Sequence, residues 1–155
     1  MCFVLYAGTT TPISRKKWDK GEWHRSLSDK DVPGLSVESL TARDAAVKVH
    51  FSHPEVQYVG SSSGCGCDFP HAMCQNSGWP ELGYVEHLDG DQSALLRQAL
   101  VSLLRASREK MVELYGLWDG DFDLAPEARE TIAAEEILSP AFRFKERGFY
   151  RVSIA

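Results

Sequence analysis

The sequence predicts a single domain of the α/β or α+β class, with a mixed, partly parallel sheet of about five strands and two to three helices. The chain has 155 residues, a length typical of one domain. Hydrophobic residues make up 43% and charged residues 25%, as in ordinary globular proteins. Segments with strand and helix patterns alternate along the chain, which favours a sheet with helices packed on it. We therefore expect one domain over residues 1–155.

Two patterns predict the strands. Short apolar runs are typical of buried strands, and alternation of apolar with polar residues is typical of strands with one solvated face. The predicted strands are 3–7, 35–40, 56–60, 112–118 and 142–154.

Leucine and alanine at helical spacing predict one clear helix, which begins after Asp91. A shorter helix is expected after Thr41, where Asp44 stands in the position that Glu takes in a capping box. A third helix is expected over 133–138. The segment 9–34 between the first two strands has little periodicity and contains Trp18 and Trp23, so we expect a long loop or flap there.

Charge and hydropathy exclude two classes of partner. A net charge of −5 and a pI near 5.5 argue against nucleic-acid binding. No stretch approaches the roughly 18 apolar residues that a membrane helix needs. The apolar start of the chain is too short for a signal peptide. We expect a cytoplasmic protein, with its small-molecule or protein partner undetermined.

Three of the four cysteines lie in one Gly- and Ser-rich stretch that follows the predicted strand 56–60. In a reducing compartment, clustered cysteines more often form a metal or reactive-thiol site than a disulfide framework. Cys65, Cys67, His71 and Cys74 offer three thiolates and one imidazole, which is a common zinc ligand set. We therefore predict a zinc-type site formed by these four residues, with His87 as a further candidate ligand.

Strand direction decides which residues join this site. If the strands are parallel, the loops after residues 7, 60 and 118 meet at one sheet edge. That edge would bring Thr9–Thr11 and the acidic turn Asp119–Asp123 to the cysteine loop. Cys2, His50 and His53 would then lie at the opposite edge.

The same residues support other functions. Cys65 and Cys67 can act as attacking and resolving thiols in a redox or transfer enzyme, with His71 or His87 as base. The run Gly60–Gly64 can present backbone N–H groups to a phosphate, although no Walker pattern follows it. A non-enzymatic binding module is the third class, and a Gly-rich turn with free cysteines is the structural alternative.

Two weaker patterns occur elsewhere. Removal of Met1 would expose Cys2 as an N-terminal nucleophile, as in amidohydrolases that begin with cysteine, but we favour Cys2 as an ordinary core residue. Asp119, Asp121 and Asp123 begin an acidic turn that partly matches a calcium loop. Leu124 stands where that loop requires Gly, so we favour a solvated turn.

Four segments of the chain together resemble a group of small uncharacterised bacterial proteins. They are Met1–Thr9, Tyr58–Cys67, Glu113–Phe122 and Phe144–Val152. The resemblance implies a single cytosolic domain and no particular activity. His71 and Cys74 lie outside these segments.

Overall fold

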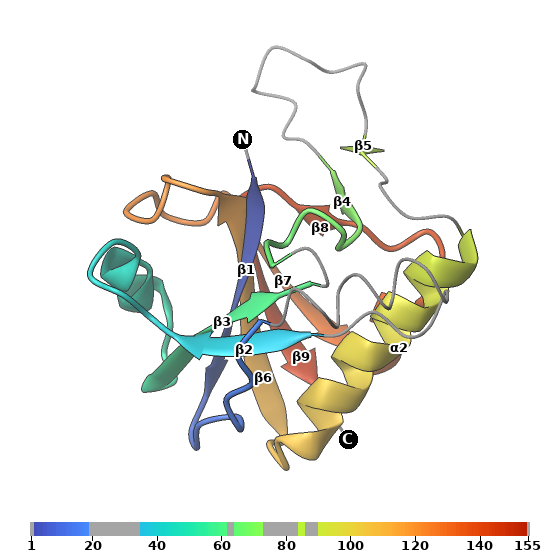
Figure 1. The fold of residues 1–155 in the computed structure, drawn as a ribbon, viewed down its shortest axis with the longest axis horizontal. Coiled ribbons are helices and arrows are strands. Elements are labelled where there is room, and N and C mark those ends of the chain that lie inside the picture. The colour runs from blue at the N-terminus through green and yellow to red at the C-terminus, as the bar shows by residue number, and fades with distance from the viewer. Residues whose placement is uncertain (1, 19–34, 62–63, 73–83, 86–89, 155) are drawn as a thin grey trace.

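A six-stranded mixed sheet forms the centre of the protein (Figure 1). This is a computed structural model, and it describes residues 2–18, 35–61, 64–72, 84–85 and 90–154. The strands of the sheet are β1 (Phe3–Thr9), β2 (Ser36–Ser39), β3 (Glu55–Gly60), β6 (Met111–Trp118), β7 (Ala128–Ala133) and β9 (Gly148–Ser153). Their order is β2-β3-β1-β6-β9-β7, and only the β7–β9 pair is parallel in this sheet. The predicted α+β domain with a mixed sheet is confirmed.

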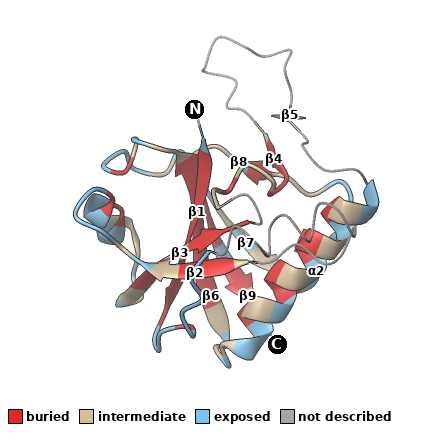
Figure 2. Cartoon of the chain, viewed as in Figure 1, coloured by how far each residue is buried: buried red, intermediate tan, exposed pale blue. Residues whose placement is uncertain are grey.

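β1 lies inside the sheet, and all seven of its residues are buried (Figure 2). Phe3 and Leu5 pack into the core on one face of the sheet, and Val4 and Tyr6 pack into the core on the other face. A strand covered on both faces needs a continuous apolar run. This explains why the start of the chain lacks alternation.

Helix α2 (Gly90–Ala106) covers one face of the sheet (Figure 1). Leu96, Leu100 and Leu104 are completely buried at helical spacing. Each such side chain contributes about 1.5–3 kcal/mol by leaving water. The other face is covered by a 3-10 helix, η1 (Ala45–His50), through its buried Val47. No helix in the described ranges is long and apolar enough to cross a membrane.

The other predicted elements agree in part with the structure. The helix expected after Thr41 is the 3-10 helix η1, and the Thr41 N–H does donate to Asp44 Oδ1 at 2.7 Å. The helix expected at 133–138 is the 3-10 helix η3 (Ala134–Leu138). The expected final strand is divided into β8 (Phe144–Lys145) and β9. β7 was not predicted from the sequence.

A second, three-stranded sheet lies beside the first, in the order β5-β4-β8 (Figure 1). β4 (His71–Ala72) pairs antiparallel with β5 (Tyr84–Val85) and parallel with β8. The sequence predicted no strand at His71–Ala72, so β4 is an addition to the expected elements.

Part of the expected flap 9–34 packs against the edge of the main sheet. The backbone of Ile13 exchanges two 2.8 Å hydrogen bonds with the side chain of Gln57. Lys16 forms an antiparallel bridge with Val37 of β2, which is the edge strand. Residues 19–34 lie outside the described residues, so the flap is tested only over 9–18.

The directions of the strands correct the expected sheet edge. β1 is antiparallel to both β3 and β6. The ends of β3 and β6 therefore share an edge with the beginning of β1. The expectation that Cys2 lies at the opposite edge is wrong, and so is the expectation that Thr9–Thr11 lie near the cysteine loop.

Candidate metal centre

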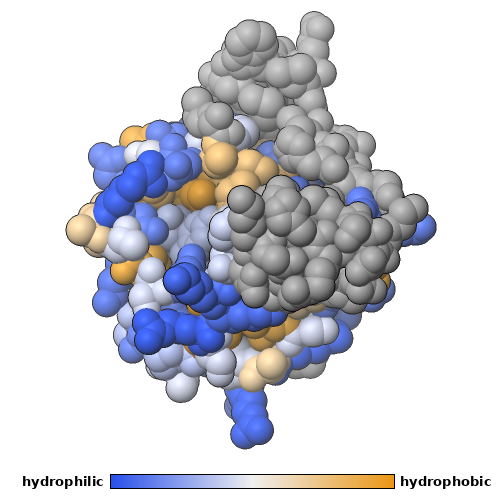
Figure 3. All heavy atoms as spheres, in the orientation of Figure 1, coloured by the Kyte–Doolittle hydropathy of each residue, from blue (hydrophilic) through white to orange (hydrophobic). Residues whose placement is uncertain are grey.

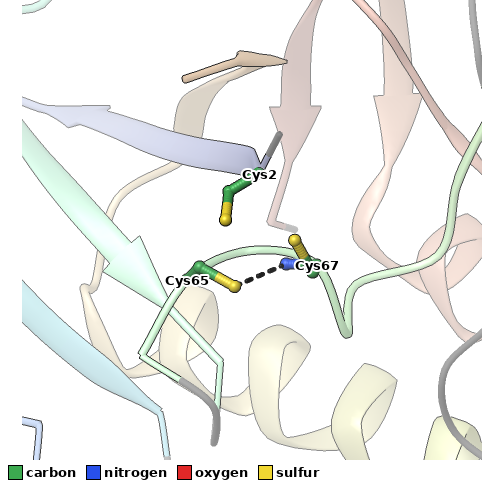
Figure 4. Close-up of side chains that lie close together, drawn as sticks. All are labelled: Cys2, Cys65 and Cys67. Atoms are coloured by element: carbon green, nitrogen blue, oxygen red, sulfur yellow. Dashed lines mark hydrogen bonds between the residues drawn. The ribbon is translucent and has the colours of Figure 1, made fainter. Parts of the chain in front are cut away.

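Three cysteine side chains meet where β1 begins and the loop after β3 returns to the sheet (Figure 4). The sulfur atoms of Cys2, Cys65 and Cys67 all lie within 4.8 Å of one another. Cys2 is exposed, so the expectation that it is an ordinary core residue is wrong. Cys65 and Cys67 are partly buried, and all three are free thiols. The site thus combines soft ligands from two segments that are distant in the sequence.

Gly66 holds the cysteine loop against the beginning of β1. Its N–H donates to the carbonyl oxygen of Phe3 at 2.9 Å. A Cβ atom at position 66 would lie 2.8 Å from the same oxygen and 3.1 Å from Cα of Val4. Glycine is therefore required here because the two backbones approach closely. This contact places Cys65 and Cys67, on either side of Gly66, next to Cys2.

Hydrogen bonds within the loop fix the position of Cys65. The N–H and hydroxyl of Ser61 donate to the Cys65 carbonyl oxygen at 2.7 and 2.6 Å. Gly64 has a φ of +89°, a conformation that L side chains rarely adopt. The hydroxyl of Tyr58 donates to the Gly64 carbonyl oxygen at 2.6 Å, which ties the loop to β3.

Backbone N–H groups point at two of the sulfur atoms. The Cys67 N–H lies 3.4 Å from Cys65 Sγ, as Figure 4 shows. A hydrogen bond to the neighbouring Cys65 thiol raises the pKa of Cys67, and burial raises it further, whereas a hydrogen bond from the backbone of Phe3 lowers it. The Cys67 thiol is therefore harder to ionise than an ordinary cysteine in the absence of a cation. A divalent ion reverses this balance, since a coordinating thiol loses its proton.

The donor set fits a soft or borderline metal ion. Thiolate sulfur selects zinc, copper(I) and iron–sulfur chemistry, whereas magnesium and calcium prefer oxygen. Tetrahedral zinc with Zn–S bonds of about 2.3 Å separates its sulfur ligands by about 3.8 Å. Cys2, Cys65 and Cys67 are close enough to reach this arrangement through small side-chain rotations. The three cysteines can therefore form a metal site for an ion such as zinc.

A cavity of about 320 Å³ adjoins the cysteines. The area is hollowed in the space-filling view, where hydrophobic atoms border it near the beginning of β1 (Figure 3). Its walls come from β1, β2, β3 and the segments that follow β2, β3 and β6. The lining residues are Cys2, Val4, Tyr6, Glu38, Ser39, Thr41, Arg43, Asp44, Tyr58, Gly64, Cys65 and Asp119.

The structure brings together two of the predicted ligands and adds one. Cys65 and Cys67 belong to the group, and Cys2 joins them. His71 does not belong to it: its ring stacks on Phe3 with centroids 4.5 Å apart, and its Nδ1 donates to the carbonyl oxygen of Phe69. Cys74 and His87 lie outside the described residues.

Cys2 was missed because the first strand was expected to run parallel to β3. The sequence does contain one relevant signal, which is the placement of Cys2 directly before a fully apolar strand. Such a strand belongs in the middle of a sheet, where either end can meet a neighbouring loop. Only the strand direction determines which end does so.

The other candidate residues have structural partners. Asp119 begins the turn after β6 and accepts a hydrogen bond from Arg43 at 2.6 Å. In a calcium loop that begins at Asp119, Glu127 and Glu130 would occupy positions nine and twelve. Glu127 instead pairs with Arg147, and Glu130 lies on strand β7, which is incompatible with such a loop. The favoured interpretation of a surface turn fits these contacts.

The two histidines before β3 lie at the far end of that strand, as expected. Nε2 of His50 lies 3.0 Å from the carbonyl oxygen of Phe122, and the backbone N–H of His53 donates to Glu113. Of the phosphate loop, Ser62 and Ser63 lie outside the described residues.

Comparisons with known proteins give no further assignment. No protein-family model matches the chain, and no curated protein and no solved structure matches it.

Proposed function

We propose that this protein binds a zinc-type metal ion through the thiolates of Cys2, Cys65 and Cys67. The observation that carries the proposal is the approach of all three sulfur atoms to within 4.8 Å of one another. Three thiolates give a net charge of −1 around a divalent ion, and this favours zinc over harder cations. The ion would hold the beginning of β1 and the loop after β3 together.

The surroundings of the sulfur atoms support a metal centre. The Cys67 N–H faces Cys65 Sγ, and the backbone of Phe3 hydrogen-bonds to Cys67. Such outer contacts orient metal ligands and stabilise their negative charge. Phe3 lies on β1, and Cys67 lies in the loop that the hydrogen bond from Gly66 to Phe3 joins to β1, so the ligands are arranged before the ion arrives.

Metal analysis of protein purified without added metal tests the proposal. We expect close to one equivalent of zinc in the wild type, and loss of the zinc in Cys2→Ser and in Cys65→Ser. His71→Gln is the matched control, because His71 lies outside the cysteine group, and this variant should keep its zinc. Circular dichroism would show that each variant is folded. Retention of zinc in Cys2→Ser would refute the three-cysteine centre.

A thiol-dependent redox or transfer enzyme is the second candidate. It is favoured by the N–H of Cys67 directed at Cys65 Sγ, since such a donor stabilises a thiolate. The hydrogen bond with Cys65, together with burial, raises the pKa of the Cys67 thiol, so Cys65 would be the attacking group. This candidate predicts a metal-free protein in which Cys65 reacts with iodoacetamide much faster than Cys67.

A further inference from the structure

The cavity beside the cysteines has one wall made of two proposed metal ligands. Cys2 and Cys65 both line it, whereas Cys67 is not among its lining residues. An ion held by the three sulfur atoms would thus have its remaining side facing this space. Zinc sites with three protein ligands and an open fourth position are the ones that bind exogenous molecules.

The size of the cavity limits what can enter. A volume of about 320 Å³ lies at the lower end of the range for small-molecule sites, roughly 300–1,000 Å³. The rings of Tyr6 and Tyr58 line the cavity and pack edge to face, with centroids 5.7 Å apart. Both rings are anchored by their hydroxyl groups, to Asp44 and to Gly64 respectively. A small molecule fits, and a folded macromolecule does not.

Carboxylates dominate the charge of the walls. Glu38, Asp44 and Asp119 line the cavity, and Arg43 is the one cationic residue among the described lining residues. The Arg43 guanidinium is already bonded to Asp119 at 2.6 Å and lies over the ring of Phe122. It is therefore neutralised by its partner and is poorly placed to receive an anion.

The other two carboxylates of the lining belong to Asp44 and Glu38. Asp44 is buried and accepts hydrogen bonds from Tyr6 and Thr41, both of which are neutral. Glu38 on β2 is the cross-strand partner of Tyr58 on β3, so the two side chains are neighbours on one face of the sheet, and both line the cavity. These acidic groups and the thiolates give the cavity a negative field, which attracts cations and repels anions.

We propose that this cavity binds a small aminothiol, whose sulfur occupies the fourth position of the metal and whose ammonium group faces the carboxylates of Glu38 and Asp44. The inference rests on the proposed metal centre. On binding, the S–H bond of the ligand breaks, a metal–sulfur bond forms and the proton passes to solvent. No electrons are transferred and no co-reactant is needed.

Three thiols with the same two-carbon spacer test the charge preference. They are cysteamine, which ends in an ammonium, 2-mercaptoethanol, which ends in a neutral hydroxyl, and 3-mercaptopropionate, which ends in a carboxylate. Each is titrated into the cobalt(II)-loaded protein while the cobalt absorption bands are followed at low salt. Each dissociation constant is calculated from the concentration of the ionised thiol, because the three thiols ionise to different extents at one pH.

We expect cysteamine to bind about tenfold or more tightly than 3-mercaptopropionate, with 2-mercaptoethanol between them. The ratio of the cysteamine affinity to the 3-mercaptopropionate affinity should be smaller in Glu38→Gln and at high ionic strength. Glu130→Gln is the matched control, since Glu130 lies on β7 at the other edge of the sheet, and its ratio should equal that of the wild type. Equal affinities for cysteamine and 3-mercaptopropionate would overturn the inference.

The failure of this inference can be distinguished from that of the metal centre. If cobalt does not bind stoichiometrically, the proposed metal centre is wrong and the aminothiol site falls with it. If cobalt binds but no thiol changes its spectrum, only the aminothiol site is wrong. Cys74→Ser gives an independent check: its cobalt spectrum should match that of the wild type, and loss of a sulfur-to-cobalt band would mean that the chain itself fills the fourth position.

Discussion

The backbone N–H of Gly66 lies 2.9 Å from the carbonyl oxygen of Phe3, and this bond joins the cysteine loop to the central strand of the sheet. Because it connects the neighbours of Cys2 with those of Cys65 and Cys67, the ligand geometry depends on it. The bond is short enough to leave no room for a side chain at position 66.

Gly66→Ala should weaken metal binding and stability together. The new methyl group would lie 2.8 Å from a backbone oxygen, so the loop must move away from β1. We expect a loss of about 1–3 kcal/mol in the free energy of unfolding, as for other overpacked sites, and a weaker affinity for zinc in competition with a chelator. Gly90→Ala is the control, because no other described residue outside its own helical turn has an atom within 4 Å of that Cβ position. An unchanged zinc affinity in Gly66→Ala would contradict the proposed role of the contact.

Glu113→Gln should destabilise the protein without touching the cysteines. The Glu113 carboxylate is buried on β6 and accepts hydrogen bonds from the N–H and hydroxyl of Ser52 and from the N–H of His53. An amide can accept at only one of its two ends and turns N–H groups toward a donor. We expect a loss of about 2–3 kcal/mol in urea unfolding. Glu130→Gln, which breaks an exposed pair with Lys145, should cost less than about 1 kcal/mol.

Glu109 should make stability depend on acid pH. Hydrogen bonds from the hydroxyl of Thr10 and from the backbone of Thr11 and Thr10 lower the pKa of Glu109 below its ordinary value of 4.5. The group therefore stabilises the fold above pH 4.5, and this contribution is lost as the pH falls through the lower folded-state pKa. Glu109→Gln should have a lower melting temperature than the wild type at pH 7, and the two curves should converge in acid. A constant difference across the pH range would show that the charge is not involved.

Tyr150 should make the stability of the fold depend on pH in the alkaline range. Burial raises the pKa of Tyr150 to about 12, against a partly opposing hydrogen bond from the Lys145 N–H. The unfolded chain ionises first, near pH 10, so stability is unaffected below pH 10 and falls between pH 10 and about 12. The slope from this group approaches about 1.4 kcal/mol per pH unit. Tyr150→Phe should decline less steeply in chemical unfolding at these pH values.

The elements that the sequence predicts best are those with a strong internal pattern. β1 begins with a continuous apolar run, β6 is mostly apolar with Glu113 as its one charged residue, and α2 repeats leucine at helical spacing, so each has a clear signal of burial. β7 was missed because it is an edge strand with an alternating, half-exposed surface, and residues such as Arg129 and Glu130 resemble those of a loop. Its parallel pairing with β9 supplies a stability that its composition does not reveal.

Two of the three cysteines of the candidate site, Cys65 and Cys67, were predicted from the sequence, and Cys2 was not. Cys65 and Cys67 are neighbours in sequence, so their proximity follows from chain length alone. Cys2 reaches them only because β1 runs antiparallel to β3, and the direction of a strand leaves no mark in its own residues. Local sequence thus identified the loop, while the long-range pairing of the sheet selected its third ligand.

The inner position of β1 also has a consequence for how the chain folds. β1 precedes both of its neighbours, β3 and β6, in the chain. Phe3 pairs with Trp118, so the pairing of β1 is complete only when this distant residue has reached it. Contacts between segments so distant in sequence form slowly, because closing the intervening loop costs entropy before any contact is made that offsets this cost. During that interval an apolar strand that ends up wholly buried is open to pairing with other chains. Refolding yield should therefore fall steeply as protein concentration rises, and a holding chaperone should restore it.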